Sequence, residues 1–249
     1  MRFNSIKLNI IKDNILKITF NRRKKLNALN TELSNELVQA LKEADKNNNI
    51  KCIIISGYDN FSAGAEINEF KVDPRFIEIW DDIDKIKKPI IASVSGLAIG
   101  GGCELLLMSD IIIASSNSKF GQPEINLGLI PGGGATQRLP RIIGLNNSME
   151  LCLTGKLINA QEAKDLGLIN KICTAEELDS VVSGIAIEIA SKPLKSITYI
   201  KKLIKESSNI ALKEGLKIEK KYFYELVKSP NGVEGINAFI EKRKPDFKN

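Results

Sequence analysis

The chain has 249 residues, of which 43% are hydrophobic and 27% are charged, and its formal net charge is +6. It contains no histidine, which excludes Ser-His-Asp triads, Cys-His dyads and the common imidazole metal sites. The length favours one domain with an appendage, and no apolar stretch approaches the ~20 residues of a membrane span. The basic charge fits attraction of a polyanionic small molecule or weak nucleic-acid affinity.

Apolar patterns predict an α/β arrangement in the first third of the chain. Alternation over residues 16–20 is typical of a half-buried strand. Asn30 then offers an N-cap to a helix that we expect to end at the asparagines 47–49. The continuous apolar run 52–55 is typical of a strand buried on both faces.

The same alternation of strand, loop and helix continues to about residue 150. We expect a second amphipathic helix around Trp80, ending before Pro89, and a buried strand over 90–94. A glycine run, a short helix near 103–108 and a strand over 111–114 follow. The recurrence indicates an α/β core of stacked units.

The pattern changes after residue 155. Asn159 with Glu162, and Thr174 with Glu177, have the spacing of capping boxes. Helical periodicity dominates from 175 to 242, and the part from 210 to 227 is more apolar than a lone helix needs. We therefore predict a core over residues 1–158 and a helical region over 159–249, packed on the core or on a neighbouring subunit.

The cysteines and the start of the chain bear on the compartment. Cys52, Cys103, Cys152 and Cys173 show no C-x-x-C spacing, so we expect reduced and mostly buried thiols, with neither disulfides nor a zinc site. The segment Met1–Ser5 lacks the apolar region and cleavage site of a signal peptide. We expect a cytoplasmic protein that does not associate with a membrane.

The glycine runs do not fit nucleotide binding. Gly132–Gly134 lacks the Gly-Lys-Ser/Thr that follows in a P-loop, and Gly100–Gly102 is followed by Leu105 where a dinucleotide fingerprint requires glycine or alanine. Bare backbone amides that lead directly into a helix can instead stabilise charge on a carbonyl oxygen, as in an oxyanion hole. Residues 61–66 form a second small-residue segment, although a plain turn after a strand would look the same.

Two glutamates follow glycine-containing turns. Glu104 follows the first glycine run directly, and Glu124 follows Gly121-Gln122-Pro123, so the pair could serve general acid/base chemistry. Simpler explanations exist for each of them. A glutamate in the first turn of a helix is stabilised by about 0.3–1 kcal/mol in any protein, and a Pro-Glu loop is commonly just exposed.

Five ordered segments with near-fixed spacing carry a resemblance to a known family. They are Asn21–Arg22 with Leu26–Leu29, Phe61–Phe70 (FSAGAEINEF), Ile99–Asp110 (IGGGCELLLMSD), Phe120–Arg138 (FGQPEINLGLIPGGGATQR) and Phe239–Phe247 (FIEKRKPDF). On these segments the chain resembles the enoyl-CoA hydratase/isomerase (crotonase) superfamily along nearly its whole length. The resemblance implies an α/β crotonase (ClpP-like) spiral of strand-strand-helix units and a C-terminal helical trimerisation region, assembled as a homotrimer or homohexamer.

The resemblance also implies the roles of individual residues. The amides of Ala65 and Gly101 would form the oxyanion hole around a thioester carbonyl. Glu104 would help to activate the water that adds to Cβ, and Glu124 would deliver a proton to Cα. The positions implied to bind the coenzyme A and acyl parts are Lys24, Leu26, Ala63, Ile67, Pro131, Gly132, Phe223 and Lys242. In the family, the last two often come from an adjacent subunit.

The predicted function is reversible addition of water to a trans-2-enoyl-CoA, giving a 3-hydroxyacyl-CoA in fatty acid metabolism. The acyl-CoA thioester is the substrate, and we expect no metal and no cofactor beyond its coenzyme A. An enoyl-CoA isomerase or another acyl-CoA lyase on the same scaffold is the first alternative, but isomerases commonly keep only one of the two glutamates. A non-catalytic binder of RNA or acyl-CoA is the second, suggested by Lys201, Lys202 and Lys205; nucleic acid is the less favoured partner.

Overall fold

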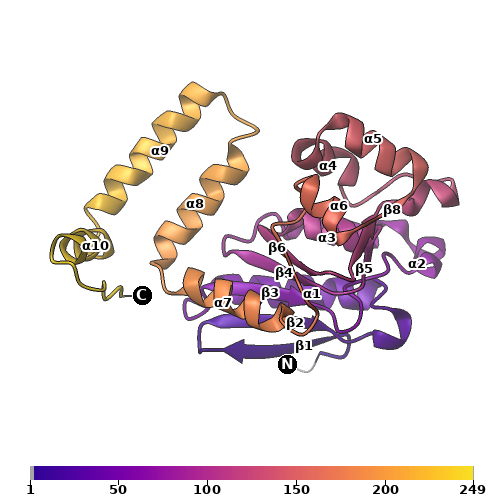
Figure 1. The fold of residues 1–249 in the computed structure, drawn as a ribbon, viewed down its shortest axis with the longest axis horizontal. Coiled ribbons are helices and arrows are strands. Elements are labelled where there is room, and N and C mark those ends of the chain that lie inside the picture. Colours follow the sequence, from indigo (N-terminus) through magenta and orange to yellow (C-terminus); the bar gives the residue numbers. More distant parts are fainter. Residues whose placement is uncertain (1–2, 249) are drawn as a thin grey trace.

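The computed structural model describes residues 3–248, with the backbone but not the side chain of Pro74. Residues 1 and 2, part of the segment from which the cytoplasmic location was predicted, and residue 249 lie outside the described residues. A core of sheets and helices holds the first three quarters of the chain, and the last three helices form an arm at its side (Figure 1).

The larger sheet has six strands in the order β1-β2-β3-β4-β6-β9. They are β1 (Ile6–Ile11), β2 (Ile15–Phe20), β3 (Cys52–Ser56), β4 (Ile90–Val94), β6 (Ile111–Ser115) and β9 (Lys171–Cys173). β1 is antiparallel to β2, and every other neighbouring pair is parallel. All residues of β3 and β4 are buried, as the continuous apolar runs in these strands predicted.

Helices cover both faces of this sheet. Helix α1 (Thr31–Lys46) and the 3-10 helix η2 (Pro74–Asp82) pack together over one face, and α7 (Leu178–Ala190) packs against β3, β4 and β6 on the other. Because side chains alternate along a strand, Ile53 and Ile55 belong to the core under α1, whereas Cys52 and Ile54 belong to the core under α7.

A three-stranded sheet positions the two glycine-containing turns that precede Glu104 and Glu124. It consists of β5 (Leu97–Ile99), β7 (Lys119–Gly121) and β8 (Leu157–Asn159), with β5 parallel and β8 antiparallel to β7. Ile99 pairs with Gly121, and the Gly100 amide donates to the Gly121 carbonyl at 2.9 Å. The parallel strands β5 and β7 therefore end side by side, and the turns that follow them are neighbours.

The remaining elements of the core surround these turns. They are η1 (Arg23–Lys25), α2 (Ile67–Val72), α3 (Gly101–Met108), η3 (Pro123–Leu127), α4 (Ala135–Ile143), α5 (Leu145–Thr154) and α6 (Ala160–Asp165). Helix α3 follows β5 after one residue, and every residue in it is buried. The helix that carries Glu104 thus lies in the interior of the core.

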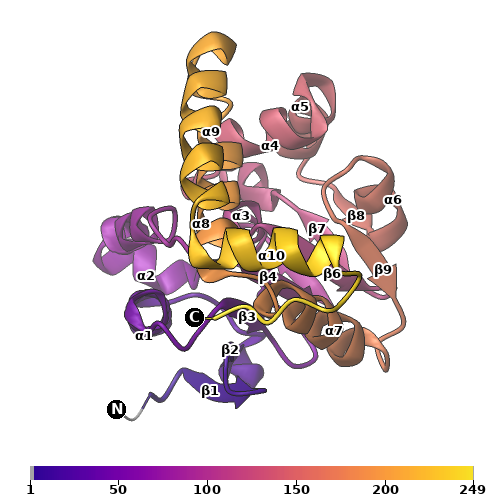
Figure 2. The ribbon, with the colours of Figure 1, turned by 90° about the vertical axis from the view of Figure 1, so that its left-hand side faces the viewer.

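The arm consists of α8 (Leu194–Glu206), α9 (Leu212–Val227) and α10 (Pro230–Ile240). Figures 1 and 2 show α9 running beside α8 and α10 crossing its end. No residue of α9 is buried, and its Leu212, Leu216 and Phe223 are exposed. None of the helices within residues 3–248 is both long and apolar enough to cross a membrane.

The predicted division at residue 158 stays a prediction. Elements beyond it still belong to the packed core: β9 pairs with β6, and α7 covers the larger sheet. The predicted mixed α/β architecture with C-terminal helices is confirmed.

Several local predictions are confirmed. The Asn30 side chain accepts from the Leu33 amide at 3.0 Å and caps α1, which ends at Lys46. Asn159 and Glu162 form a capping box on α6. All four cysteines are free; Cys52 and Cys103 are buried, whereas Cys152 and Cys173 are half-buried, so burial of the thiols is confirmed for two of the four.

The helix predicted around Trp80 differs in type. It is a 3-10 helix, whose side chains align every three residues. Ile77 packs against the core, Trp80 is buried, and beyond the helix the same spacing continues with the buried Ile83 and Ile86. An α-helix would have spread such a pattern around its surface.

Candidate active site

A cavity of about 560 Å³ lies where the two glycine-containing turns meet α2 and η2. Seven of the residues predicted from the sequence line it: Ala63, Ala65, Ile67, Gly101, Glu104, Glu124 and Gly132. Apolar side chains form most of its remaining wall, namely Phe70, Ile77, Trp80, Leu127, Leu129 and Ile130. The cavity therefore combines an apolar lining with two carboxylates.

Glu104 is held in one orientation by the turn at Gly133–Ala135, which includes the end of the second glycine run. It lies in the first turn of α3 and is 3% exposed. Its Oε1 accepts from the amides of Gly133 at 2.7 Å and Ala135 at 3.0 Å. Burial raises the pKa of Glu104, whereas these two amides and the positive charge of Arg138 oppose the rise by stabilising the carboxylate.

Glu124 lies in the first turn of η3, after Pro123. Burial, aided by the nearby charge of Glu104, raises the pKa of Glu124 from 4.5 to about 7. With its nitrogen facing Glu124, the fully buried Gln122 amide lies 3.2 Å from both carboxylate oxygens. Two carboxyl groups in one cavity thus differ in environment: Glu104 accepts hydrogen bonds from backbone amides, and Glu124 is protonated up to near-neutral pH.

Glycine is required at position 100, next to Glu124. Its φ of +52° is unfavourable for residues with a side chain, and a Cβ atom there would lie 3.0 Å from Oε1 of Glu124. The absence of a side chain lets the turn after β5 approach the second carboxylate.

Two backbone amides are available in the cavity. Within residues 3–248, neither the Ala65 amide nor the Gly101 amide donates a hydrogen bond. The two are neighbours, because a Cβ atom on Gly101 would lie 3.4 Å from the Ala65 nitrogen. The Gly101 amide also begins α3, where the helix dipole is positive. Together they can bind a carbonyl oxygen on which negative charge develops.

Trp80 forms the floor of the cavity, beneath the turns that carry Gly101 and Gly133. It is 1% exposed, and its Nε1 donates to Ser34 Oγ of α1 at 3.1 Å. Cβ atoms at Gly101 and Gly133 would lie 3.0 Å and 2.7 Å from its ring. Its sequence pattern placed Trp80 only in a helix; the one signal for a role in the site was that it is the single tryptophan of the chain.

The other predicted residues lie outside the cavity wall. Leu26 adopts a left-handed conformation after η1 and its carbonyl accepts from the Ala63 amide at 3.0 Å, so η1, with Lys24, lies beside the cavity. Pro131 is buried next to Gly132. Phe223 lies on α9 and Lys242 follows α10, and the structure does not bring either to the cavity of the same chain (Figure 1).

Comparison with known proteins agrees with this geometry. Residues 10–249 match the family model described as enoyl-CoA hydratase/isomerase. The chain is 45% identical to the mitochondrial enoyl-CoA hydratase of Pongo abelii, over 93% of this chain and 82% of that protein. It is 42% identical to a probable enoyl-CoA hydratase of Rhizobium meliloti, over 93% of each. A crystal structure from Geobacillus kaustophilus, described as an enoyl-CoA hydratase subunit I, superposes with a TM-score of 0.95 at 37% identity, covering 99% of this chain and 98% of that one.

Proposed function

Since the chain belongs to the enoyl-CoA hydratase/isomerase family, we propose that it is an enoyl-CoA hydratase. The reaction is reversible addition of water to a trans-2-enoyl-CoA, and its product is a 3-hydroxyacyl-CoA. The observation that carries this proposal is the pair of carboxyl groups in different environments, Glu104 buried and Glu124 half-buried, beside two amides that donate no hydrogen bond within residues 3–248.

The amides of Ala65 and Gly101 bind the thioester carbonyl oxygen. Polarising this C=O group makes Cβ electrophilic, and the enolate oxygen formed by addition carries negative charge that the two donors stabilise. Loss of one such donor typically lowers the rate by about 10²–10³.

The two glutamates divide the proton transfers. Glu104, as carboxylate, accepts a proton from water as the water oxygen bonds to Cβ, and Glu124, as carboxylic acid, gives a proton to Cα. A later proton transfer from Glu104 to Glu124 restores the starting state, so the balance is uptake of one water. The raised pKa of Glu124, about 7, supports its role as the acid, and the two amides on Glu104 support its role as the base. Each such group contributes roughly 10²–10⁴ in rate.

The rest of the cavity suits a CoA thioester. The apolar wall of Phe70, Leu127 and Ile130 receives the acyl chain, with Ile67 and Gly132. Pro131, buried next to Gly132, supports this wall from behind. Lys24, Leu26 and Ala63 hold the coenzyme A part at the rim, and the positive net charge favours approach of this polyanion. The scheme uses no metal or cofactor besides the substrate's own coenzyme A.

We further propose a homotrimer or homohexamer in which another copy contributes Phe223 and Lys242. The exposed apolar side chains of α9 support this, because large unpartnered apolar surfaces are typical of interfaces. Sedimentation tests it, and a stable monomer would contradict it. A cytoplasmic location stays a prediction.

Hydration of crotonyl-CoA, followed by chromatography, tests the activity. Glu104→Gln and Glu124→Gln should each abolish most of it; near-full hydration by both variants would refute the mechanism. Conversion of a 3-enoyl-CoA without hydration of the 2-enoyl-CoA would favour the isomerase instead. Presence of both glutamates favours hydration.

A further inference from the structure

Arg138 lies behind the turn that holds Glu104 and does not line the cavity. It belongs to α4 and borders a separate hollow of about 410 Å³ on the other side of Gly132–Gly134. Building on the proposed hydratase function, we propose that Arg138 is a positioning residue. It holds the Gly133–Ala135 turn, and hence the Glu104 carboxylate, and it ties this turn through Asp84 and Lys205 to α8.

One arm of the guanidinium acts on the turn itself. Arg138 Nη1 donates to the Gly133 carbonyl at 2.9 Å, and the Gly133 amide donates to Glu104 Oε1 at 2.7 Å. Gly133 is therefore held on both sides, by Arg138 behind and by Glu104 in front. Gly134 has a φ of +108°, and a Cβ atom there would lie 1.9 Å from Nη1 of Arg138. The guanidinium thus occupies space that only glycine leaves open.

The other terminal nitrogen of the guanidinium, Nη2, faces helix α8. Arg138 Nη2 forms an ion pair with Asp84, whose other oxygen lies 3.9 Å from Lys205 Nζ of α8. Lys205 Nζ also donates to the Met108 carbonyl at 3.3 Å, at the last residue of α3. A lysine in this position stabilises the negative end of the helix dipole. This series of charged side chains therefore contacts the C-terminal end of α3 as well as the turn next to its N-terminal end.

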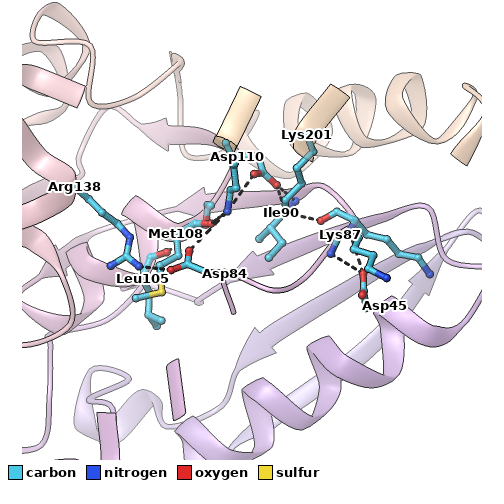
Figure 3. Close-up of polar contacts among 12 residues, drawn as sticks. Asp45, Asp84, Lys87, Ile90, Leu105, Met108, Asp110, Arg138 and Lys201 are labelled. Atoms are coloured by element: carbon cyan, nitrogen blue, oxygen red, sulfur yellow. Dashed lines mark hydrogen bonds and ion pairs between the residues drawn. The ribbon is translucent and has the colours of Figure 1, made fainter. Parts of the chain in front are cut away.

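The series of charged side chains continues into the core beyond Lys205. Lys205 lies 3.7 Å from Asp110, which pairs with the buried Lys201 at 2.7 Å and accepts from the Ile90 amide at 2.8 Å. Figure 3 shows Arg138, Asp84, Asp110 and Lys201 following one another, with dashed lines for the contacts among the residues drawn. The position of the turn thus depends on how α8 sits on the core.

Arg138 also affects the charge of Glu104. The titratable groups near Glu104 are Glu124 of η3, Cys103 of α3 and Cys152 of α5, and Arg138 supplies a positive charge from α4. Removing that charge removes one cause that lowers the pKa of Glu104. A larger fraction of Glu104 would then be protonated at a given pH, and the base would be lost at a higher pH than in the wild type.

The decisive experiment compares Arg138→Met with Arg138→Lys in the full-length protein. Arg138→Met should lower kcat by up to about 100-fold with little change in KM, because a misplaced base affects the chemical step. The acid limb of its pH–kcat profile should move to higher pH. Arg138→Lys keeps the charge without the fork, so it should restore the acid limb while recovering only part of kcat.

Arg141→Gln is the matched control. Arg141 lies on the same helix, is exposed, and donates to the Gln137 carbonyl of its own helix. It should leave kcat and the pH profile unchanged. Wild-type kcat and acid limb in Arg138→Met, or an equal loss in Arg141→Gln, would overturn the proposal.

A titration of the Glu104 carboxyl by ¹³C NMR, assigned with Glu104→Gln, separates this proposal from the proposed function. If the wild type does not hydrate enoyl-CoA, the proposed function fails, yet Arg138→Met should still raise the pKa of Glu104. An unchanged pKa would overturn the role of Arg138. Should Arg138→Met not fold, Asp84→Asn, which breaks the ion pair, should lower kcat in the same way to a smaller extent. Unaltered kcat in Asp84→Asn would then count against the proposal.

Discussion

Helices α3 and α9 differ in how much of their surface the same chain buries. All eight residues of α3 are buried, whereas none of the sixteen residues of α9 is, although α9 carries leucines and aromatic side chains. The core surrounds α3 with residues from the same chain on every side. Helix α9 packs mainly along α8 and α10, and its Leu212, Leu216 and Phe223 stay exposed. The two carboxyl groups and the two amides of the cavity therefore lie in the densely packed part of the chain, and the proposed subunit contact lies in the open part.

The largest expected contrast comes from the two carboxyl groups of the cavity. Glu104→Gln and Glu124→Gln should each lower kcat for hydration by about 10²–10⁴, because each removes an acid or base in an otherwise unchanged cavity. Thermal unfolding should show that both variants remain folded. Glu176→Gln, an exposed glutamate before α7, is the control and should keep full activity. Similar losses in all three variants would contradict the assignment.

The second test concerns the floor of the cavity. Trp80→Ala should lower the free energy of unfolding by about 3–5 kcal/mol, because it leaves a large void in the core and an unpartnered Ser34 hydroxyl. Trp80→Phe keeps most of the volume and should cost less. Chemical denaturation measures both values; an equal cost for the two variants would mean that the volume of Trp80 does not determine its contribution.

The pH dependence gives a smaller effect. Glu124 must be protonated to act as the acid and its pKa is about 7, so forward hydration should fall above about pH 7, by about tenfold per pH unit. The folded state also binds this proton more tightly than the unfolded state, where the pKa is near 4.5. Stability should therefore decline as pH rises through this window.

Glu124→Gln cannot ionise and should lose the part of the pH dependence of stability that Glu124 contributes between about pH 4.5 and 7. The melting temperature across this range checks the prediction. A wild-type melting temperature that rises over the same window would show that other groups dominate.

The smallest expected effect on folding belongs to the arm. Phe223 is 60% exposed, so Phe223→Ala should change the unfolding of a single chain very little. It should instead weaken assembly, seen as a lower sedimentation coefficient, and raise KM for the acyl-CoA. A large loss of stability at a protein concentration where only monomers exist would break the contrast between α3 and α9.

The sequence predicted those features that depend on neighbouring residues. Alternation and continuous apolar runs located β2 and β3, and the cap at Asn30 located the start of α1 within one residue. The resemblance of the glycine segments to a family added Ala65 and Gly101, which lie far apart in the chain and adjacent in the cavity. Local patterns alone could not have paired them.

Other features depend on contacts between distant residues and were missed. The ion pair of Arg138 with Asp84 spans 54 residues, and nothing near either residue indicates it. Trp80 was assigned to a helix without a role, because its contacts with Gly101 and Gly133 arise only when η2 is folded against α3. The three-residue spacing of η2 was present in the sequence, but over the two turns around Trp80 it also fits an amphipathic α-helix, and only its continuation to Ile83 and Ile86 distinguishes the two.

The short pairing of β5 with β7 has a consequence for how sequence change acts on this protein. Only three residues of each strand pair, yet this register determines how Gly100 and Glu124 face each other. A slip by one residue would displace Glu124 by about 3.3 Å and leave the six-stranded sheet untouched. Because Phe120 of β7 is fully buried, the same slip would also turn its side chain away from the core, so such a variant would lose stability together with activity. Selection against a change of register in this short sheet should therefore act on folding and on activity at once.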